Sequence, residues 1–506
     1  MTETEIKLSL DPRDAGRLRG SPALAAVRPT RRRLRSIFLD TAGAELEAAG
    51  YALRLRRAAG RWMQAVKAGA SGSGGLHLRE EWEFPRPGPE VDLSLFAATP
   101  FARLPGVETL HERLLAVFTV EVEREAWVVE PAPGSRLEVV LDRGEVVSGE
   151  RREAVCEVEV ELLEGPVEAA FALAEALLDG TRMRPCAVSK AERGYRLFHG
   201  TALRPEKARP VALEAAMSPP QAARAVVAGA MRHLEANEEG LLATRDPEFV
   251  HQLRVGLRRL RAAIRLFREV IGPARAARWN EGLAAVGRAL GEARDWDVFA
   301  TETLPPMVSA WGDRTLARSI SGRVQARRRR AREAARAAIS APDYARHLLD
   351  IGRWLATGDP AAGDAGPPEP LLDFASKCIR KRHRRLIADS AHVARLSPAE
   401  RHRLRLDAKR LRYGVEGLGS LFKAKRVEDY TETLALLQGA LGHANDAANA
   451  ERLLAELAPP GDFRDFARGW LAASTRADLA ALQAPVERLA RTKRFWRRKP
   501  PGAEAV

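Results

Sequence analysis

The first 200 residues alternate between charged and mostly apolar side chains over many short stretches. The opening run places Glu3, Glu5 and Lys7 at one parity of residues 3–8. Because successive side chains of a strand point to opposite faces, such runs predict strands with one charged and one packed face. We expect strands at 3–8, 35–40, 51–57, 62–67, 78–84, 119–128, 136–142 and 155–163. Eight such strands with turn-like breaks predict an α+β domain, an eight-stranded antiparallel barrel with flanking helices.

From about residue 213 the apolar period changes to about 3.6, and Ala, Leu, Arg and Glu dominate, which predicts an all-α domain. The segment 204–220 carries four prolines and is the expected linker between the domains. The Gly-, Pro- and Asp-rich stretch Thr357–Pro370 is expected to divide the helical region in two. The predicted domains are therefore 1–203, the linker 204–220, and 221–500, with halves at about 221–355 and 371–500.

The helical region contains an internal repeat with a spacing of 151 residues. The matching basic positions are His251, Arg254, Arg258 and Arg261 in the first copy, and His402, Arg405, Lys409 and Arg412 in the second. The match continues, since Asp295 corresponds to Asp446, although Arg294 corresponds to Asn445. The period is too long for a solenoid, so we expect two pseudo-symmetric helical bundle repeats.

Charge is distributed unevenly between the two regions. Residues 1–200 hold 28 Lys and Arg against 31 Asp and Glu, whereas the remaining 306 residues hold 54 against 36. The strongly basic second region therefore predicts a polyanionic partner. No run of eighteen apolar residues is present, which argues against a membrane partner. Three scattered cysteines exclude a disulfide frame, and we expect a cytoplasmic protein.

The charged faces of the predicted strands carry acids and bases together. If the apolar faces pack against helices, the charged faces line a wet tunnel inside the barrel. Several Lys and Arg side chains suit a chain of phosphates, and clustered carboxylates suit a hard divalent cation, Mg²⁺ or Mn²⁺. The alternative is that these acids are only ion-pair partners of the bases, and Glu83, Glu157 and Arg193 in particular fit either description.

The first region resembles the CYTH domain, the triphosphate tunnel metalloenzyme family. The resemblance rests on motifs in family order across residues 1–200, namely ETEIK at 3–7, FLDT at 38–41, LRLR at 53–56, WMQAVK at 62–67, REEWE at 79–83, LDRG at 141–144, EVEVEL at 157–162 and SKAERGY at 189–195. The resemblance implies hydrolysis of inorganic triphosphate with a divalent metal. It implies a catalytic or substrate-binding role for Glu5, Lys7, Arg54, Arg56, Lys67, Arg124, Lys190 and Arg193, and a metal-binding role for Glu3, Glu5, Glu81, Asp142, Glu159 and Glu161.

The second region resembles the CHAD domain, the conserved-histidine α-helical domain. The motifs are HQLRVGLRRLR at 251–261, LGEARDWDV at 290–298, HRLRLDAKRLRY at 402–413 and LQGALGHANDAANA at 437–450. The resemblance implies binding of inorganic polyphosphate, and association with polyphosphate granules would follow from it. The implied binding residues are the eight basic positions of the repeat, with Arg380, Lys381, His383 and Arg384 added.

Other functions share parts of these features. The tunnel fold is compatible with thiamine triphosphate, nucleoside triphosphates or an adenylate cyclase-like reaction. A protein that binds or targets polyphosphate granules, with weak triphosphatase activity, also fits. Arg-rich helical faces bind nucleic acid backbones as well, but the basic faces lack interleaved aromatic residues, so we do not expect a nucleic acid partner.

Overall fold

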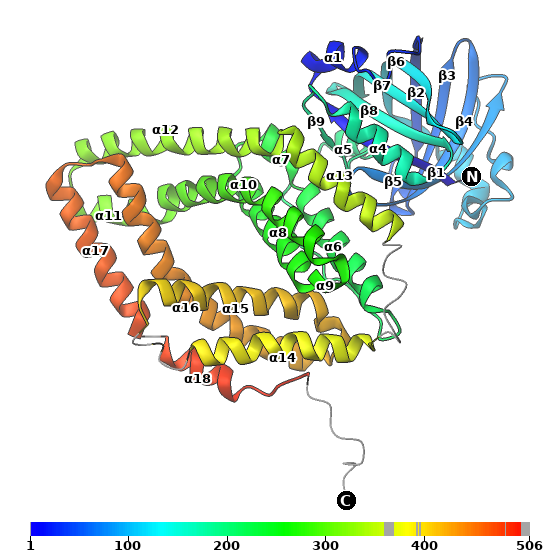
Figure 1. Cartoon of the computed structure of the whole chain (residues 1–506). Coiled ribbons are helices and arrows are strands. Elements are labelled where there is room, and N and C mark those ends of the chain that lie inside the picture. Colours follow the sequence, from blue (N-terminus) through cyan, green and yellow to red (C-terminus); the bar gives the residue numbers. More distant parts are fainter. Residues whose placement is uncertain (1, 359–368, 391–392, 394–395, 481, 497–506) are drawn as a thin grey trace, which may run out of the picture. The chain divides into compact units, whose positions relative to one another are not determined.

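The computed structural model describes residues 2–358, 369–390, 393, 396–480 and 482–496 (Figure 1). The described chain forms two compact units. The first unit, called the barrel unit, contains residues up to 205 together with residues 339–359. The second, called the helical unit, contains residues 206–338 and the chain from 360 onward. Most of the stretch Thr357–Pro370 and the C-terminal residues 497–506 lie outside the described residues.

The barrel unit is built on a single antiparallel sheet. Its strands are β1 Thr2–Leu10, β2 Thr30–Asp40, β3 Tyr51–Ala58, β4 Arg61–Ser71, β5 Leu76–Arg86, β6 Leu115–Ala132, β7 Ser135–Ser148, β8 Arg151–Glu164 and the short β9 Met183–Pro185. The strand order is β5-β4-β3-β2-β6-β7-β8-β1, and β1 also pairs with β5, so eight strands close into a barrel. The short β9 adds to β1. The predicted eight-stranded barrel is confirmed.

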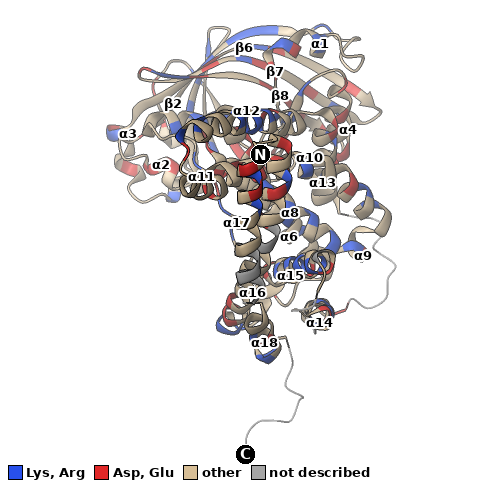
Figure 2. Ribbon diagram, turned by 90° about the vertical axis from the view of Figure 1, so that its left-hand side faces the viewer, with Lys and Arg blue, Asp and Glu red and all other residues tan. Residues whose placement is uncertain are grey.

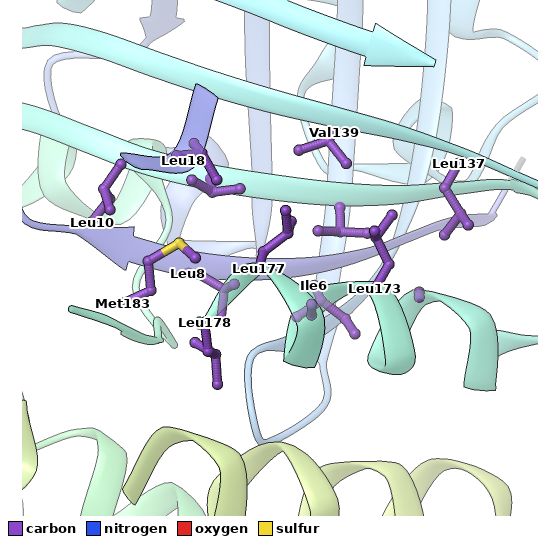
Figure 3. Packing of buried hydrophobic residues seen from close by; sticks show 14 of the residues in the cluster. Ile6, Leu8, Leu10, Leu18, Leu137, Val139, Leu173, Leu177, Leu178 and Met183 are labelled. Carbon is purple, nitrogen blue, oxygen red and sulfur yellow. The ribbon is translucent and has the colours of Figure 1, made fainter. Parts of the chain in front are cut away.

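Helices cover the outside of this barrel and close one of its ends. They are α1 Ala15–Arg19, α2 Glu45–Ala48, α3 Leu110–Arg113, α4 Val167–Leu177, α5 Lys190–His199 and α13 Pro342–Thr357. The apolar parity of β1, Ile6 and Leu8, is fully buried against Leu173 and Leu177 of α4 (Figure 3). This outward burial of the apolar parity turns Glu3, Glu5 and Lys7 toward the barrel interior.

One end of the barrel interior is apolar. Leu34, Phe38, Phe118 and Val146 form a buried cluster there with Tyr195 of α5. The ring of Phe38 stacks on that of Phe118 at a centroid distance of 4.5 Å, and Tyr195 meets Phe118 edge to face. Helix α5 therefore closes this end, and its first residue, Lys190, lies next to the charged part of the interior.

The helical unit consists of long helices in two sets. The first set is α6 Pro219–Glu235, α7 Glu238–Ala243, α8 Pro247–Leu266, α9 Arg268–Ile271, α10 Pro273–Val298, α11 Leu304–Trp311 and α12 Arg314–Ile339, and the second is α14 Leu371–Asp389, α15 Pro398–Leu418, α16 Ala424–Leu457, α17 Gly461–Ala480 and α18 Gln483–Arg491. The repeat places α8 opposite α15 in sequence register and α10 opposite α16. A π-turn at Phe299–Thr303 follows α10, whereas α16 runs on unbroken.

One predicted boundary differs from the structure. The segment 204–220, predicted as the linker, makes hydrogen bonds to the helical unit, since the Glu206 amide donates to Asn237 Oδ1 and the Leu213 amide donates to Ser420 Oγ. Helix α13, which was expected to end the first helical repeat, packs with the barrel unit instead. An amphipathic helix does not reveal from its sequence which apolar surface it will cover. Within the described residues, no helix combines the length and apolarity needed to cross a membrane.

Candidate active site and candidate anion-binding groove

Strand register brings the charged side chains of the barrel interior together. Glu5 of β1 lies opposite Glu161 of β8, and Lys7 lies opposite Glu159. Because directly opposed residues of antiparallel strands share a face, these side chains meet inside the barrel. We call the ion-paired interior side chains described below the tunnel network.

Lys190 is the most heavily paired cation of the tunnel network. Its Nζ lies 2.7 Å from Asp142 Oδ2 and 2.9 Å from Glu159 Oε1, and it also contacts Glu157. Ser189 caps α5 through a capping box, which fixes Lys190 as the first helical residue. Burial alone would lower the pKa of Lys190, but the three carboxylates outweigh burial and raise this pKa. Lys190 therefore carries a fixed positive charge inside the barrel.

Lys7 and Arg124 share the same carboxylates. Lys7 Nζ lies 3.2 Å from Glu159 and 3.5 Å from Glu5, and the Lys7 side chain is only 3% exposed. Arg124 makes a bidentate pair with Asp142 at 2.8 and 2.7 Å. Burial opposes the charge of both cations, yet neighbouring carboxylates raise both pKa values.

A second part of the tunnel network lies on β3, β4 and β5. Arg54 Nη2 donates to Glu81 at 2.8 Å and to Glu83 at 3.2 Å. Lys67 Nζ lies 2.7 Å from Glu3 and 2.9 Å from Glu81. Glu81, predicted to bind metal, is therefore bonded to two cations, and these cations lower its pKa against the effect of burial.

Arg56 is an interior cation that takes no part in the ion pairs described above. Its Nε donates to Ser36 Oγ at 3.4 Å, and among the described residues no carboxylate lies within ion-pair distance of its guanidinium. Burial, together with the nearby Arg54 and Arg124, lowers the pKa of Arg56 to about 9. A half-buried guanidinium near two other guanidinium groups has the chemistry to accept an anion.

Glu161 is an interior carboxylate that takes no part in the ion pairs described above. No cation of the described chain pairs with it, and burial followed by Glu3, Glu138 and Glu5 raises the pKa of its carboxyl group to about 7. Glu138, which the sequence analysis missed, lies opposite Glu161 on β7. Glu138 has the same strand parity as Asp142. Val140 lies between them at that parity, so the alternation of charge did not extend to Glu138 in the sequence.

Two groups of carboxylates offer oxygen ligands for a metal. Asp142, Glu157 and Glu159 have oxygens within 4.8 Å of one another, but Lys190 already occupies the space between them. Glu161 instead repels its neighbouring carboxylates, a repulsion that a divalent cation would relieve. The chemistry of the Glu161 group therefore fits a metal, and Asp142 is placed by the structure as an ion-pair partner.

Two arginines complete the interior. Arg193, expected to bind substrate, lies 3.6 Å from Glu153 and 4.0 Å from Glu157 and donates to Cys186 Sγ at 3.6 Å. Arg79, which was not predicted as a site residue, lies opposite Glu3 and has a buried Nε without a hydrogen-bond partner. Its Nη2 lies 3.2 Å from His77 Nδ1, a contact that the charge pattern along β5 does not reveal.

In the helical unit a pocket lies where α8, α10, α15 and α16 meet, and we call it the helical groove. Its basic lining consists of His251, Arg254, Arg258, Arg294 and Arg405, and its acidic lining includes Asp295, Glu302 and Asp446. Val298, Phe299, Ala450 and Leu453 supply apolar lining, and Lys and Arg colour stretches of α8 and α15 blue in Figure 2. Residues from both repeats thus converge on one pocket.

The cations of the helical groove are incompletely paired. Arg258 and Arg405 each have a buried Nε without a hydrogen-bond partner, and neither guanidinium lies within ion-pair distance of a described carboxylate. Burial lowers the pKa values of Arg258 and Arg405. Burial also lowers the pKa of Lys409 to about 7, helped by Arg405, Arg258 and Arg254. Two groove cations do have a carboxylate partner, since Arg254 lies 3.3 Å from Asp295 and Arg294 lies 3.6 Å from Glu302.

The remaining predicted groove residues lie differently. Arg261 packs near Gly287 of α10, and Arg412 donates to Glu416 at 2.7 Å and to Gln438 at 3.1 Å. His402 is exposed, as is Arg380. None of these four side chains lines the helical groove, and the side chain of Asn445 lies outside the described residues.

His383 is a correction to the sequence-based expectation. It is 2% exposed, its Nδ1 shares a hydrogen bond of 2.8 Å with Tyr430 Oη, and its ring packs edge to face on Trp496. Burial lowers its pKa to about 4, so it is neutral at physiological pH. A neutral histidine inside an aromatic cluster cannot bind polyphosphate, and the neighbouring basic residues on α14 gave a misleading signal.

The comparisons with known proteins agree with this organisation. A CYTH domain model matches residues 1–195, and a CHAD domain model matches residues 225–455. An inorganic triphosphatase of Haemophilus influenzae is 31% identical over 147 residues, which covers 29% of this chain and 40% of that protein. The crystal structure of the CHAD domain from the plant Ricinus communis is 32% identical and aligns with a TM-score of 0.50, covering 56% of this chain and 97% of that chain. The chain therefore belongs to the proteins that combine a CYTH domain with a CHAD domain.

Proposed function

We propose that the barrel unit hydrolyses inorganic triphosphate with a divalent metal, Mg²⁺ or Mn²⁺. This proposal rests on two interior side chains that lack an oppositely charged partner among the described residues, whereas their charged neighbours form ion pairs. Arg56 is a half-buried cation without an ion-pair partner among the described residues, and Glu161 is a carboxylate among carboxylates. A metal-bound chain of phosphates supplies the missing partner at both positions.

The charge balance of the interior gives the metal a clear role. The carboxylates are Glu3, Glu5, Glu81, Glu83, Glu138, Asp142, Glu157, Glu159 and Glu161, and the cations are Lys7, Arg54, Arg56, Lys67, Arg79, Arg124, Lys190 and Arg193. Among these residues the carboxylates are at least as numerous as the cations, so net charge attracts no polyanion. Glu161 and Glu5, with Glu3, Glu138 and Glu159 nearby, would hold the metal, which would neutralise phosphate charge and activate water.

The paired cations would bind and orient the substrate. Lys7, Arg54, Lys67, Arg124 and Lys190 now hold carboxylates, and phosphate oxygens would replace part of these contacts. Because these cations are fixed before substrate arrives, little reorganisation is needed in the transition state. Phosphoryl transfer depends mainly on such positioning and on electrostatic stabilisation.

Phosphate release from tripolyphosphate, with Mg²⁺ or Mn²⁺ and after chelation, tests this function. Arg56→Ala should lower kcat/KM by about 10²-fold, the order of magnitude for one lost transition-state contact. Its neighbour Arg57 is exposed and lies at the other strand parity, so Arg57→Ala should behave like the wild type. Equal activity of the two variants would remove Arg56 from the site.

A substrate panel separates the related reactions. Tripolyphosphate, thiamine triphosphate and nucleoside triphosphates share the triphosphate that the tunnel network would bind. We propose the bare triphosphate because the tunnel network offers charged contacts to phosphate, whereas the aromatic rings at the apolar end of the interior, Phe38, Phe118 and Tyr195, already pack on one another. A higher kcat/KM for ATP or thiamine triphosphate, or formation of a cyclic nucleotide, would contradict inorganic triphosphate as the preferred substrate.

We propose that the helical groove binds inorganic polyphosphate. The supporting observation is that Arg258 and Arg405 converge on the helical groove from two different repeats, both partly buried and neither ion-paired among the described residues. Lys409, one helical turn after Arg405, lies close enough to both for their charges to lower its pKa. A phosphate chain offers a line of charge without base or sugar, which suits a groove without exposed aromatic rings. Association with polyphosphate granules stays a prediction that follows from this binding.

Competition between polyphosphate and single-stranded RNA across a salt series tests the groove. We expect polyphosphate to displace RNA, with an affinity that falls as salt rises because counterions are released. Arg405→Ala should weaken binding by about tenfold, since one charge-assisted contact is lost. Arg403 is an exposed arginine on the same helix, and Arg403→Ala is the matched control. Preferential binding of RNA would contradict the proposal.

A further inference from the structure

The glycine-rich loop between β4 and β5 is a packed structural element. Gly72, Gly74 and Gly75 have φ values of 141°, 68° and 80°, in the region that favours glycine. Ser73, Gly74 and Gly75 are buried. A loop of this composition would be mobile if it were solvated, so its burial requires specific partners on both sides.

One partner is the backbone of Lys7. The Lys7 amide donates to Gly75 O at 2.8 Å, and the Cys186 amide donates to Lys7 O at 2.9 Å. A Cβ atom on Gly75 would lie 2.9 Å from Lys7 O, so no larger residue fits there without displacing β1. The loop therefore fixes the backbone of the cation whose side chain reaches Glu159 and Glu5.

The other partner is helix α13. A Cβ atom on Gly74 would lie 2.8 Å from both Gly352 Cα and Leu348 O. The reverse also holds, because a Cβ atom on Gly352 would lie 3.1 Å from Gly74 Cα and from Ser73 O. Loop and helix thus approach through backbone atoms alone, with the light-blue loop beside the yellow-green α13 in Figure 3.

Helix α13 is held firmly against the barrel unit. Ala345 and Leu349 are buried in the same apolar cluster as Phe171 of α4. Arg346 on this helix forms ion pairs with Asp179 and Asp343. A helix anchored by apolar packing can transmit its position to a loop that touches it by backbone contact, because close-packed groups do not deform independently.

We propose that α13 is a brace that positions Lys7, and that Gly352 is its positioning residue. The line of contact runs from Gly352 to Gly74, through Gly75, to the Lys7 amide. In sequence, α13 lies between the two repeats of the helical region, so the barrel unit is completed by a segment that follows the first repeat. The inference rests on the proposed triphosphatase function for its kinetic consequence, but not for its structural one.

The alternative is that α13 only covers the apolar outer surface of β1 and α4. The two roles predict different outcomes for a methyl group at position 352. Alanine favours helix over glycine, so a covering role predicts unchanged or higher stability and normal kinetics for Gly352→Ala. A brace predicts displacement of the loop, and with it lower activity, without loss of melting temperature.

The test uses the full chain carrying Gly352→Ala, Gly352→Val and the control Ala356→Val at an exposed position of α13. Hydrogen–deuterium exchange should accelerate in 2–10 and 72–78 for the Gly352 variants only. For tripolyphosphate, kcat/KM should fall by about tenfold for alanine and by 10²-fold for valine, the scale of a misplacement by about 1 Å.

The outcomes separate the brace from the proposed function. If the wild type released no phosphate from any triphosphate, the function would fail while exchange still decided the brace. If Gly352→Val matched Ala356→Val in exchange at both segments, the brace would be wrong. A loss of melting temperature in Gly352→Val with normal kcat/KM would also overturn it. If Gly352→Val did not fold, the smaller Gly352→Ala variant would decide on the same measurements.

Discussion

The tunnel network and the helical groove both present many cations, but they hold them in opposite electrostatic states. In the tunnel network, Lys190 and Lys7 lie among carboxylates that raise their pKa values. Arg258 and Arg405 in the helical groove, and Lys409 beside them, lie near other cations, and burial and repulsion lower their pKa values. The same residue types therefore serve as stabilising partners in one unit and as sources of strain in the other.

This difference has a consequence for ligand binding. An interior whose charges are already balanced needs a metal before it can accept a polyanion, and it keeps its geometry without substrate. A groove with uncompensated cations gains stability when a polyanion binds, because the ligand removes the repulsion. The comparison thus predicts that substitution of a buried lysine has opposite effects on stability in the two units.

The largest effect is expected for Lys190→Met. This change leaves Asp142, Glu157 and Glu159 without a main cationic partner inside the barrel. Removing one member of a buried ion-pair network typically costs about 3–5 kcal/mol of unfolding free energy. Denaturant unfolding should show this loss, and tripolyphosphate hydrolysis should fall by at least about 10²-fold. Wild-type stability in this variant would show that the network is not coupled as described.

The second effect has the opposite sign and concerns Lys409→Met. Loss of a lysine from among Arg405, Arg258 and Arg254 should raise the unfolding free energy by about 1–2 kcal/mol, a discounted figure because water screens part of the repulsion. Polyphosphate affinity should fall at the same time by about tenfold. Thermal unfolding and a titration with polyphosphate measure the two changes in one protein.

The pH dependence of the same lysine sharpens this prediction. Its pKa in the folded protein is lowered to about 7 from 10.5, so its contribution to stability is present above 10.5 and is lost as the pH falls toward 7. Polyphosphate affinity should follow the opposite course and weaken as the pH rises above 7. Lys409→Arg, which keeps its charge, should abolish this dependence. A pH-independent affinity in the wild type would contradict it.

The smallest effect is expected for Glu161. Burial and its carboxylate neighbours raise its pKa to about 7, so without metal its contribution to stability is present below the unfolded value of about 4.5 and is lost as the pH rises through 7. Mn²⁺ or Mg²⁺ should therefore raise the melting temperature more at pH 8 than at pH 5. Glu161→Gln should remove most of this difference, and the exposed Glu164→Gln should retain it. A metal effect equal at both pH values would place the metal elsewhere.

The alternation of charge and apolarity predicted the barrel correctly, because period and parity are local properties of the chain. Parity also predicted which side chains face the interior, as the opposition of Glu5 to Glu161 and of Lys7 to Glu159 requires. It did not show which charges remain unpaired. The distinction between Glu81, bonded to two cations, and Glu161, bonded to none, depends on distances across strands.

The internal repeat predicted the two helical bundles because the spacing of matching residues, like period and parity, can be read from the sequence alone. The sequence by itself thus determined the fold classes, the tunnel parity and the basic faces of α8 and α15. Only the tertiary structure decided that His383 enters an aromatic cluster and that α13 joins the barrel unit. Those outcomes depend on which surface each side chain meets, and a backbone approach such as that of Gly352 to Gly74 exists only once both elements are packed.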